Sequence, residues 1–113
     1  MRILSNDFGG YPYPVQLARE LARRGHDVLH THCASLTTTP GGATAPRADD
    51  PPTLRLQGLT LGRPLEKYNF ARRLFQEREY GRLLSAAARA FRPDVVLSAN
   101  TPLDAQGMLL RET

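Results

Sequence analysis

Short apolar runs alternate with helical patterns along most of the chain. Residues 2–6 form an apolar run that is typical of a buried strand, and the glycines and proline of residues 7–12 end it in a turn. Residues 27–32 predict a second strand, because Val28 and Leu29 lie between a glycine that can end a helix and a later loop. Between these runs, residues 14–22 repeat apolar positions at helical spacing. The order predicts a strand, a helix and a strand.

The first helical pattern predicts an amphipathic helix with one face on the sheet. Arg19 falls on the charged side, which we expect to face solvent, and Gly25 is a typical C-terminal stop. The apolar side, which we expect to pack on the sheet, consists of Pro14, Leu17, Ala18, Leu21 and Ala22.

The second half of the chain repeats the alternation after a long connection. Residues 33–52 are rich in Thr, Pro, Gly and Ala without periodicity, which is typical of a functional or an unstructured loop. A weakly alternating run at residues 54–56, extendable to residue 61, predicts a third strand. Residues 68–91 predict a long helix, and residues 94–98 predict a fourth, apolar strand.

The end of the chain predicts a last helix, with Thr101 as its N-cap and Pro102 as its first residue. Strands that alternate with helices favour right-handed crossovers and a parallel sheet. The predicted fold class is α/β, with a Rossmann-like parallel sheet and helices on both faces. Because residues 95–97 would leave a naked apolar edge, we expect the sheet to be incomplete within residues 1–113.

Composition fits one small domain, since 41% of the 113 residues are hydrophobic and 23% are charged. The net charge of +4 rests on arginine, because Lys67 is the lone lysine among fifteen basic residues. Arginine on helices argues against nucleic acid and leaves phosphates, nucleotides or a membrane surface as anionic partners. We expect a cytoplasmic protein, with peripheral contact to the cytoplasmic membrane face as an option, because no apolar run suits a membrane span or signal peptide.

Candidate chemistry gathers after the first and fourth strands. In a sheet ordered 3-2-1-4, the loops that follow these two strands meet at the switch point, where ligands bind. Gly9 and Gly10 would let a phosphate or sugar approach backbone amides near a helix N-terminus. The alternative is an ordinary turn, since the dinucleotide fingerprint G-x-G-x-x-G is absent. Asn100 and Thr101 could hydrogen-bond a hydroxylated ligand, and their alternative role is helix capping.

Other polar residues have simpler interpretations. His30 and His32 would share one strand face, but without acidic or thiolate companions we expect no metal site. Cys33, the lone cysteine, fits a small buried residue, and His26 suits the C-terminal end of the first helix. Several arginines of the long helix predict either a solvated face or contact with anionic lipid headgroups: Arg72, Arg73, Arg78, Arg82 and Arg89.

The order of these segments resembles the N-terminal domain of glycosyltransferase family 4, whose members are retaining, metal-independent enzymes with two Rossmann-like domains, the GT-B architecture. The resemblance spans nearly the whole chain. It is carried by residues 1–12 (MRILSNDFGGYP), 15–28 (VQLARELARRGHDV) and 92–102 (RPDVVLSANTP).

The resemblance implies a role for each segment. Gly9 and Gly10 would lie against the sugar-nucleotide diphosphate and the acceptor, and Asn100 stands where many members carry a histidine that contacts the donor sugar. The family's second domain, which binds most of the nucleotide and stabilises the leaving diphosphate, is absent from residues 1–113. We therefore expect an acceptor-side domain that is inactive alone, from an enzyme of bacterial-type polysaccharide or glycolipid assembly, with a nucleotide-sugar substrate and no cofactor.

Two alternatives remain. The first is a non-catalytic Rossmann-like binding module, or a subunit that pairs with a separate chain carrying the second domain. The second is a dinucleotide-dependent oxidoreductase or transferase, which the missing G-x-G-x-x-G disfavours.

Overall fold

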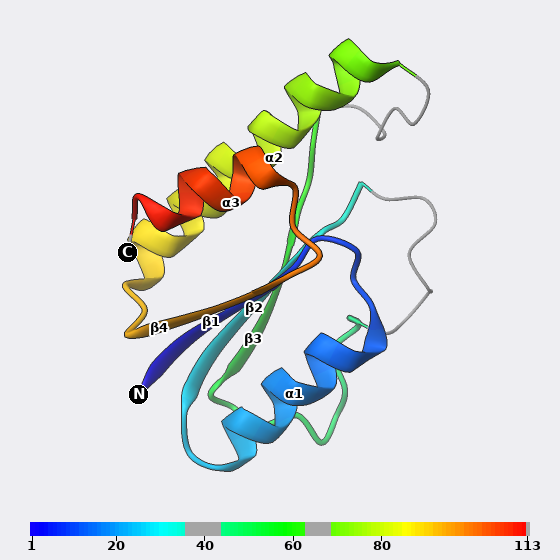
Figure 1. The fold of residues 1–113 in the computed structure, drawn as a ribbon. Coiled ribbons are helices and arrows are strands. Elements are labelled where there is room, and N and C mark those ends of the chain that lie inside the picture. The colour runs from blue at the N-terminus through cyan, green and yellow to red at the C-terminus, as the bar shows by residue number, and fades with distance from the viewer. Residues whose placement is uncertain (36–43, 63–68, 113) are drawn as a thin grey trace.

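In a computed structural model, which describes residues 1–35, 44–62 and 69–112, the chain folds around a parallel sheet. The sheet has four strands in the order β3-β2-β1-β4, and every neighbouring pair within the described residues is parallel (Figure 1). The predicted α/β class and strand order are confirmed. The strands are β1 (Arg2–Asp7), β2 (Asp27–Cys33), β3 (Leu54–Leu59) and β4 (Val95–Ala99).

Helices cover both faces of the sheet, as parallel strands require for their crossovers. The helix α1 (Pro12–Arg23) lies on one face, while α2 (Phe70–Phe91) and α3 (Leu103–Leu110) lie side by side on the other (Figure 1). Asn69 caps α2, because its side chain accepts a hydrogen bond from the amide of Arg72 at 3.1 Å. The predicted start of this helix at residue 68 lies outside the described residues, as do residues 36–43 of the predicted long loop.

The apolar core is divided unequally by the sheet. Alternate residues of each strand point to opposite faces, so Leu4 of β1 joins a large cluster under α2 and α3, whereas Ile3 joins a small one under α1. The small cluster contains only Ile3, Ala18, Ala22 and Val28 as buried members. We infer that α1 depends on polar contacts as well as on apolar burial.

Arg19 of α1 corrects the expectation that its charged side faces solvent. Its side chain is 1% exposed, and its Nε lies 2.7 Å from Oδ1 of Asp50. A second donor of the same guanidinium bonds to the carbonyl of Ala45 at 2.9 Å. The sequence prediction was wrong because residues Ala45 and Asp50 contact this side of α1, and Asp50 brings the countercharge that makes a buried guanidinium tolerable.

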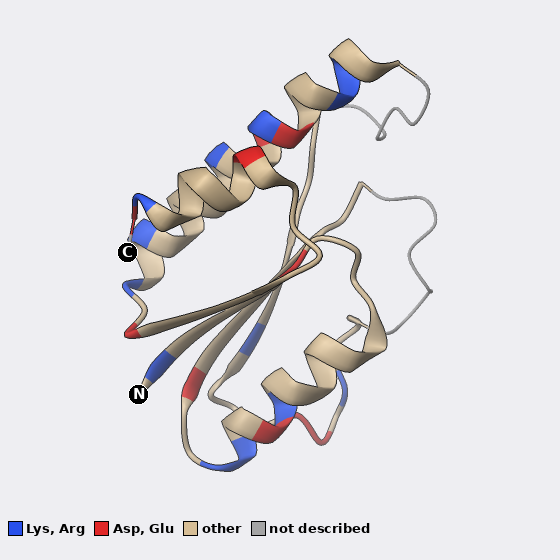
Figure 2. Cartoon of the chain, viewed as in Figure 1, with Lys and Arg blue, Asp and Glu red and all other residues tan. Residues whose placement is uncertain are grey.

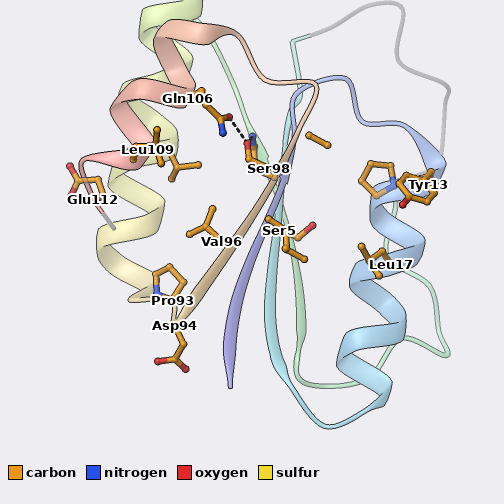
Figure 3. A pocket seen from close by; sticks show the side chains of 15 residues that line it. Ser5, Tyr13, Leu17, Pro93, Asp94, Val96, Ser98, Gln106, Leu109 and Glu112 are labelled. Carbon is orange, nitrogen blue, oxygen red and sulfur yellow. Dashed lines mark hydrogen bonds between the residues drawn. The ribbon is translucent and has the colours of Figure 1, made fainter.

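Leu17 also departs from the predicted apolar face, since 40% of it is exposed. It lies on the side of α1 near β4, where the sheet ends (Figure 3). No further strand among the described residues covers this side, which leaves the leucine open to solvent.

The start of α3 is a second correction. The helix begins at Leu103 with Pro102 as its N-cap residue, so Thr101 does not cap it and Pro102 is not its first residue. The hydroxyl of Thr101 instead donates to the carbonyl of Ala99 at 2.9 Å and accepts from Nδ2 of Asn6 at 2.6 Å. Its hydrogen-bonding capacity is used inside the crevice rather than at the helix terminus.

Candidate functional site at the carboxyl ends of β1 and β4

The loops that follow β1 and β4 meet at the switch point of the sheet. The last residues of the two strands, Asp7 and Ala99, are register partners. Nδ2 of Asn100 donates to Oδ1 of Asp7 at 3.2 Å and thereby links the two loops directly. The two loops therefore meet as the strand order predicts; a ligand site at Gly9, Gly10, Asn100 and Thr101 stays a prediction.

Asp7 occupies the centre of this region and organises the glycine loop. Its side chain is completely buried and accepts hydrogen bonds from the amides of Gly9, at 3.3 Å, and Tyr11, at 2.6 Å. The amide of Gly10 bonds to the carbonyl oxygen of Asp7 at 3.2 Å. The amides that could cradle an anion are therefore engaged by Asp7, two by its carboxylate and one by its backbone carbonyl, and the sequence pattern did not indicate this role.

The first turn of α1 has few remaining donors. A helix N-terminus normally offers four amides without intrahelical partners. Here the N-cap amide, from Tyr11, is bonded to Asp7, and the prolines at positions 12 and 14 carry no N–H. Tyr13 supplies the remaining amide of that turn, so the helix dipole persists with little hydrogen-bonding capacity for a phosphate.

Both glycines are explained by local geometry. Gly10 has a φ of 66°, a left-handed conformation in which a side chain costs roughly 1 kcal/mol. A Cβ on Gly9 would lie 2.2 Å from Cε2 of Tyr11, so any larger residue would push that ring aside. Both positions therefore require glycine for local reasons that do not involve a ligand.

The backbone conformation at position 100 favours asparagine, and the residue is also exposed. Its φ is 49°, in the left-handed region that asparagine tolerates better than most residues. Its amide nitrogen bonds to Asp7, while the residue as a whole stays exposed at the crevice. Asn100 can thus fix the loop and still present polar atoms to a ligand.

Beneath the crevice lies a buried hydrogen-bond network centred on Asn6. Its Oδ1 accepts from the hydroxyls of Thr31, at 2.9 Å, and Tyr80, at 2.5 Å, while its Nδ2 donates to Thr101. Burial raises the pKa of Tyr80 and keeps its phenol protonated as a donor. The network joins β1, β2 and α2 to the loop after β4. Its one signal in the sequence was a polar residue at the end of an apolar run.

The two histidines of β2 share one face, as predicted, and both are sheltered from water. His30 is fully buried, with its Nδ1 3.0 Å from the hydroxyl of Ser5. Burial is the main cause, and the nearby His32 the second, of a pKa of His30 lowered to about 4. Burial also lowers the pKa of His32. Both rings are therefore neutral at pH 7. Within the described ranges, no group of three or more His, Cys, Asp or Glu residues is placed to hold a metal.

A groove of about 700 Å³ runs along β4, and Gly9, Gly10, Asn100 and Thr101 are not among its lining residues. Figure 3 shows Tyr13 and Leu17 of α1 on one side of it and Leu109 of α3 on the other, with Ser98 between them. Val95 and Leu97 of β4 are 38% and 37% exposed, as expected for the predicted apolar edge. The hydroxyl of Ser98 donates to Oε1 of Gln106 at 2.8 Å, which ties the strand to α3.

The arginines of α2 are largely paired with carboxylates. Three ion pairs hold Arg73 to Glu77, Arg78 to Asp104 and Arg89 to Glu112. At Arg73 and Arg78 these pairs favour a solvated face over a lipid-binding one. Among the described helices, none is both long and apolar enough to cross a membrane.

Comparison with known proteins adds no relative. The chain matches no family model, no curated protein and no solved structure. Its function is therefore inferred from the crevice and from the resemblance described above.

Proposed function

We propose that the chain is the acceptor-side, Rossmann-like part of a glycosyltransferase that moves a sugar from a nucleotide-sugar donor to a saccharide or lipid-linked acceptor. The observation that carries the proposal is the meeting of the glycine loop and the Asn100 loop at the switch point, where Asn100 bonds to Asp7 at 3.2 Å. The same two loops carry the family resemblance.

The hydrogen bonds of Asp7 favour the acceptor side of such an enzyme. A diphosphate needs free donors and positive charge, whereas this loop places a carboxylate among its own amides. A sugar is neutral and carries many hydroxyls, which suit the exposed amide of Asn100, while Gly9 and Gly10 are buried with their amides bonded to Asp7. In the complete enzyme, a second domain would bind the nucleoside diphosphate and stabilise the charge that develops on it during transfer.

A non-catalytic binding module or partner-dependent subunit is the second candidate. It is favoured by the same engaged amides, because a loop that is saturated by Asp7 contributes little to charge stabilisation. In that case the crevice would recognise a saccharide without transferring it.

The test begins with the longest product of the coding region, assayed for transfer and hydrolysis with a panel of sugar nucleotides. Gly10→Ala is compared with Gly25→Ala, because both residues have positive φ, of 66° and 96°, and an added Cβ at Gly25 meets nothing within 4 Å. Each substitution places a side chain at a positive φ, at a backbone cost of roughly 1 kcal/mol or more, but only Gly10 lies at the crevice.

We expect Gly10→Ala to lower kcat/KM by at least tenfold relative to Gly25→Ala at equal folded fraction. Equal activities for the two variants would remove the glycine loop from the site. Saccharide binding without turnover on any donor would favour the binding module.

A further inference from the structure

A small pocket lies between α2 and α3, on the side of these helices away from the crevice. Its volume is about 210 Å³, which exceeds the roughly 30 Å³ that one water takes up in the liquid. Figure 2 shows basic positions spread along α2, and Arg111 directly follows the last residue of α3. The pocket is lined by Arg82, Ser85, Arg89, Met108, Arg111 and Glu112.

The pocket carries excess positive charge. Arg89 is paired with Glu112 at 2.6 Å, which neutralises one of its three guanidinium groups. Neither Arg82 nor Arg111 forms an ion pair with any other described residue. Two unneutralised guanidinium groups thus face one small volume.

Ser85 is the second observation that points to a ligand. It is 6% exposed, and its buried Oγ has no hydrogen-bond partner within the described part of the chain. A buried hydroxyl without a partner is costly, so its presence calls for an acceptor. Spacings of three and four residues place Arg82, Ser85 and Arg89 on one face of α2. Ser85 is also one of the residues that line the pocket.

We propose that this pocket binds a phosphate group, at a site separate from the crevice. Phosphate is small, doubly charged near neutral pH and rich in acceptors, and guanidinium groups bind it through paired hydrogen bonds. The C-terminal dipoles of α2 and α3 oppose an anion, but each amounts to only about half a charge and is screened by water. The group belongs to a soluble phosphorylated molecule or to an anionic lipid headgroup.

The test is an amide NMR titration of the chain with inorganic phosphate at low ionic strength. We expect saturable shifts at residues 82–89 and 108–112. Arg82→Gln should weaken binding roughly tenfold, since it removes a charge-assisted hydrogen bond, and Ser85→Ala should weaken it by a smaller factor. Arg72→Gln is the matched control, because it removes the same charge from an exposed position of α2 outside the pocket.

Glu112→Gln should change the affinity for phosphate in the opposite direction. It removes the carboxylate that competes for Arg89, so phosphate should bind more tightly. Absence of saturable binding, or an equal loss in Arg82→Gln and Arg72→Gln, would overturn the proposal.

Vesicles distinguish the two sources of phosphate. Co-sedimentation with vesicles of phosphatidylcholine and phosphatidic acid that is sensitive to Arg82→Gln assigns a lipid headgroup. Binding of inorganic phosphate without vesicle binding assigns a soluble ligand. Neither outcome depends on transfer activity, so failure here leaves the glycosyltransferase proposal intact.

Discussion

The ion pair between Arg19 and Asp50 gives the clearest test of how α1 is held on the sheet. We consider Asp50→Asn, which keeps the shape of the side chain and removes its charge. The carboxylate contacts Nε of Arg19 at 2.7 Å and accepts the amide of Arg47 at 2.8 Å. Asp49, its exposed neighbour, has no ion pair with another described residue, so Asp49→Asn is the matched control.

The expected cost follows from burial. Removal of one partner from a buried ion pair costs about 3–5 kcal/mol, because the other charge stays buried without compensation. Arg19 is 1% and Asp50 11% exposed, and Arg19 keeps its bond to the carbonyl of Ala45, so we expect the lower end, about 3 kcal/mol. At about 4 °C per kcal/mol for a chain of this size, the melting temperature should fall by about 12 °C.

The assay is urea and thermal unfolding followed by circular dichroism, extended to the double variant with Arg19→Met. Because removal of both charges leaves no buried charge unpaired, the double variant should lose less stability than the sum of the single variants. If Asp50→Asn falls within about 0.5 kcal/mol of Asp49→Asn, or the single costs add, the ion pair does not hold α1 in place.

The pH dependence of the same pair has a definite sign. Burial alone would raise the pKa of Asp50, but the hydrogen bonds from Arg19 and Arg47 outweigh it and hold the pKa below its ordinary value of 3.8. A carboxyl whose pKa is lower in the folded state stabilises the protein at pH values above its unfolded-state pKa. This stability is lost as the pH falls through the folded-state pKa. Below about pH 4, wild type should therefore lose stability more steeply than Asp50→Asn in urea titrations.

Two further predictions concern buried polar groups. The folded-state pKa of His30, about 4, lies below its ordinary 6.5, so the unfolded chain takes up the proton first as the pH falls. Lowering the pH from 7 to 5 should therefore reduce the free energy of unfolding by about 2 kcal/mol. Urea unfolding of His30→Gln should show a flatter dependence of stability on pH. Tyr80→Phe removes a donor to Asn6 and should lower the free energy of unfolding by about 1 kcal/mol. Tyr13→Phe is the control, because this residue is 75% exposed and its loss of a hydroxyl should leave the urea midpoint unchanged. Equal midpoints for the two variants would contradict the Asn6 network.

The fold was predictable because its signals are local and repetitive. Apolar runs alternate with helical periodicity, and the expected order of strands brings the loops after β1 and β4 together. The unpaired edge at β4 was likewise visible from three consecutive apolar residues at its position. These features follow from the periodicity of apolar residues and from the order of strands and helices along the chain.

The polar interior was not predictable by the same means. Helical spacing places Arg19 opposite the apolar stripe, but it cannot indicate that residues 44–50 fold over that side and bring Asp50. Asn6 and Tyr80 are 74 residues apart, and only the packing of α2 on the sheet brings them to 2.5 Å. Asp7 was overlooked because its role depends on backbone amides, which the sequence does not mark.

The most direct test of the crevice as a ligand site is an amide NMR titration of the chain with saccharides and nucleotide sugars, repeated on Asn100→Gly. Glycine keeps the left-handed backbone at this position and removes only the amide side chain. We predict saturable shifts at residues 9–11 and 98–101 for at least one saccharide, with binding weakened roughly tenfold in the variant. Absence of shifts in both loops, or equal affinity in the two proteins, would contradict the account.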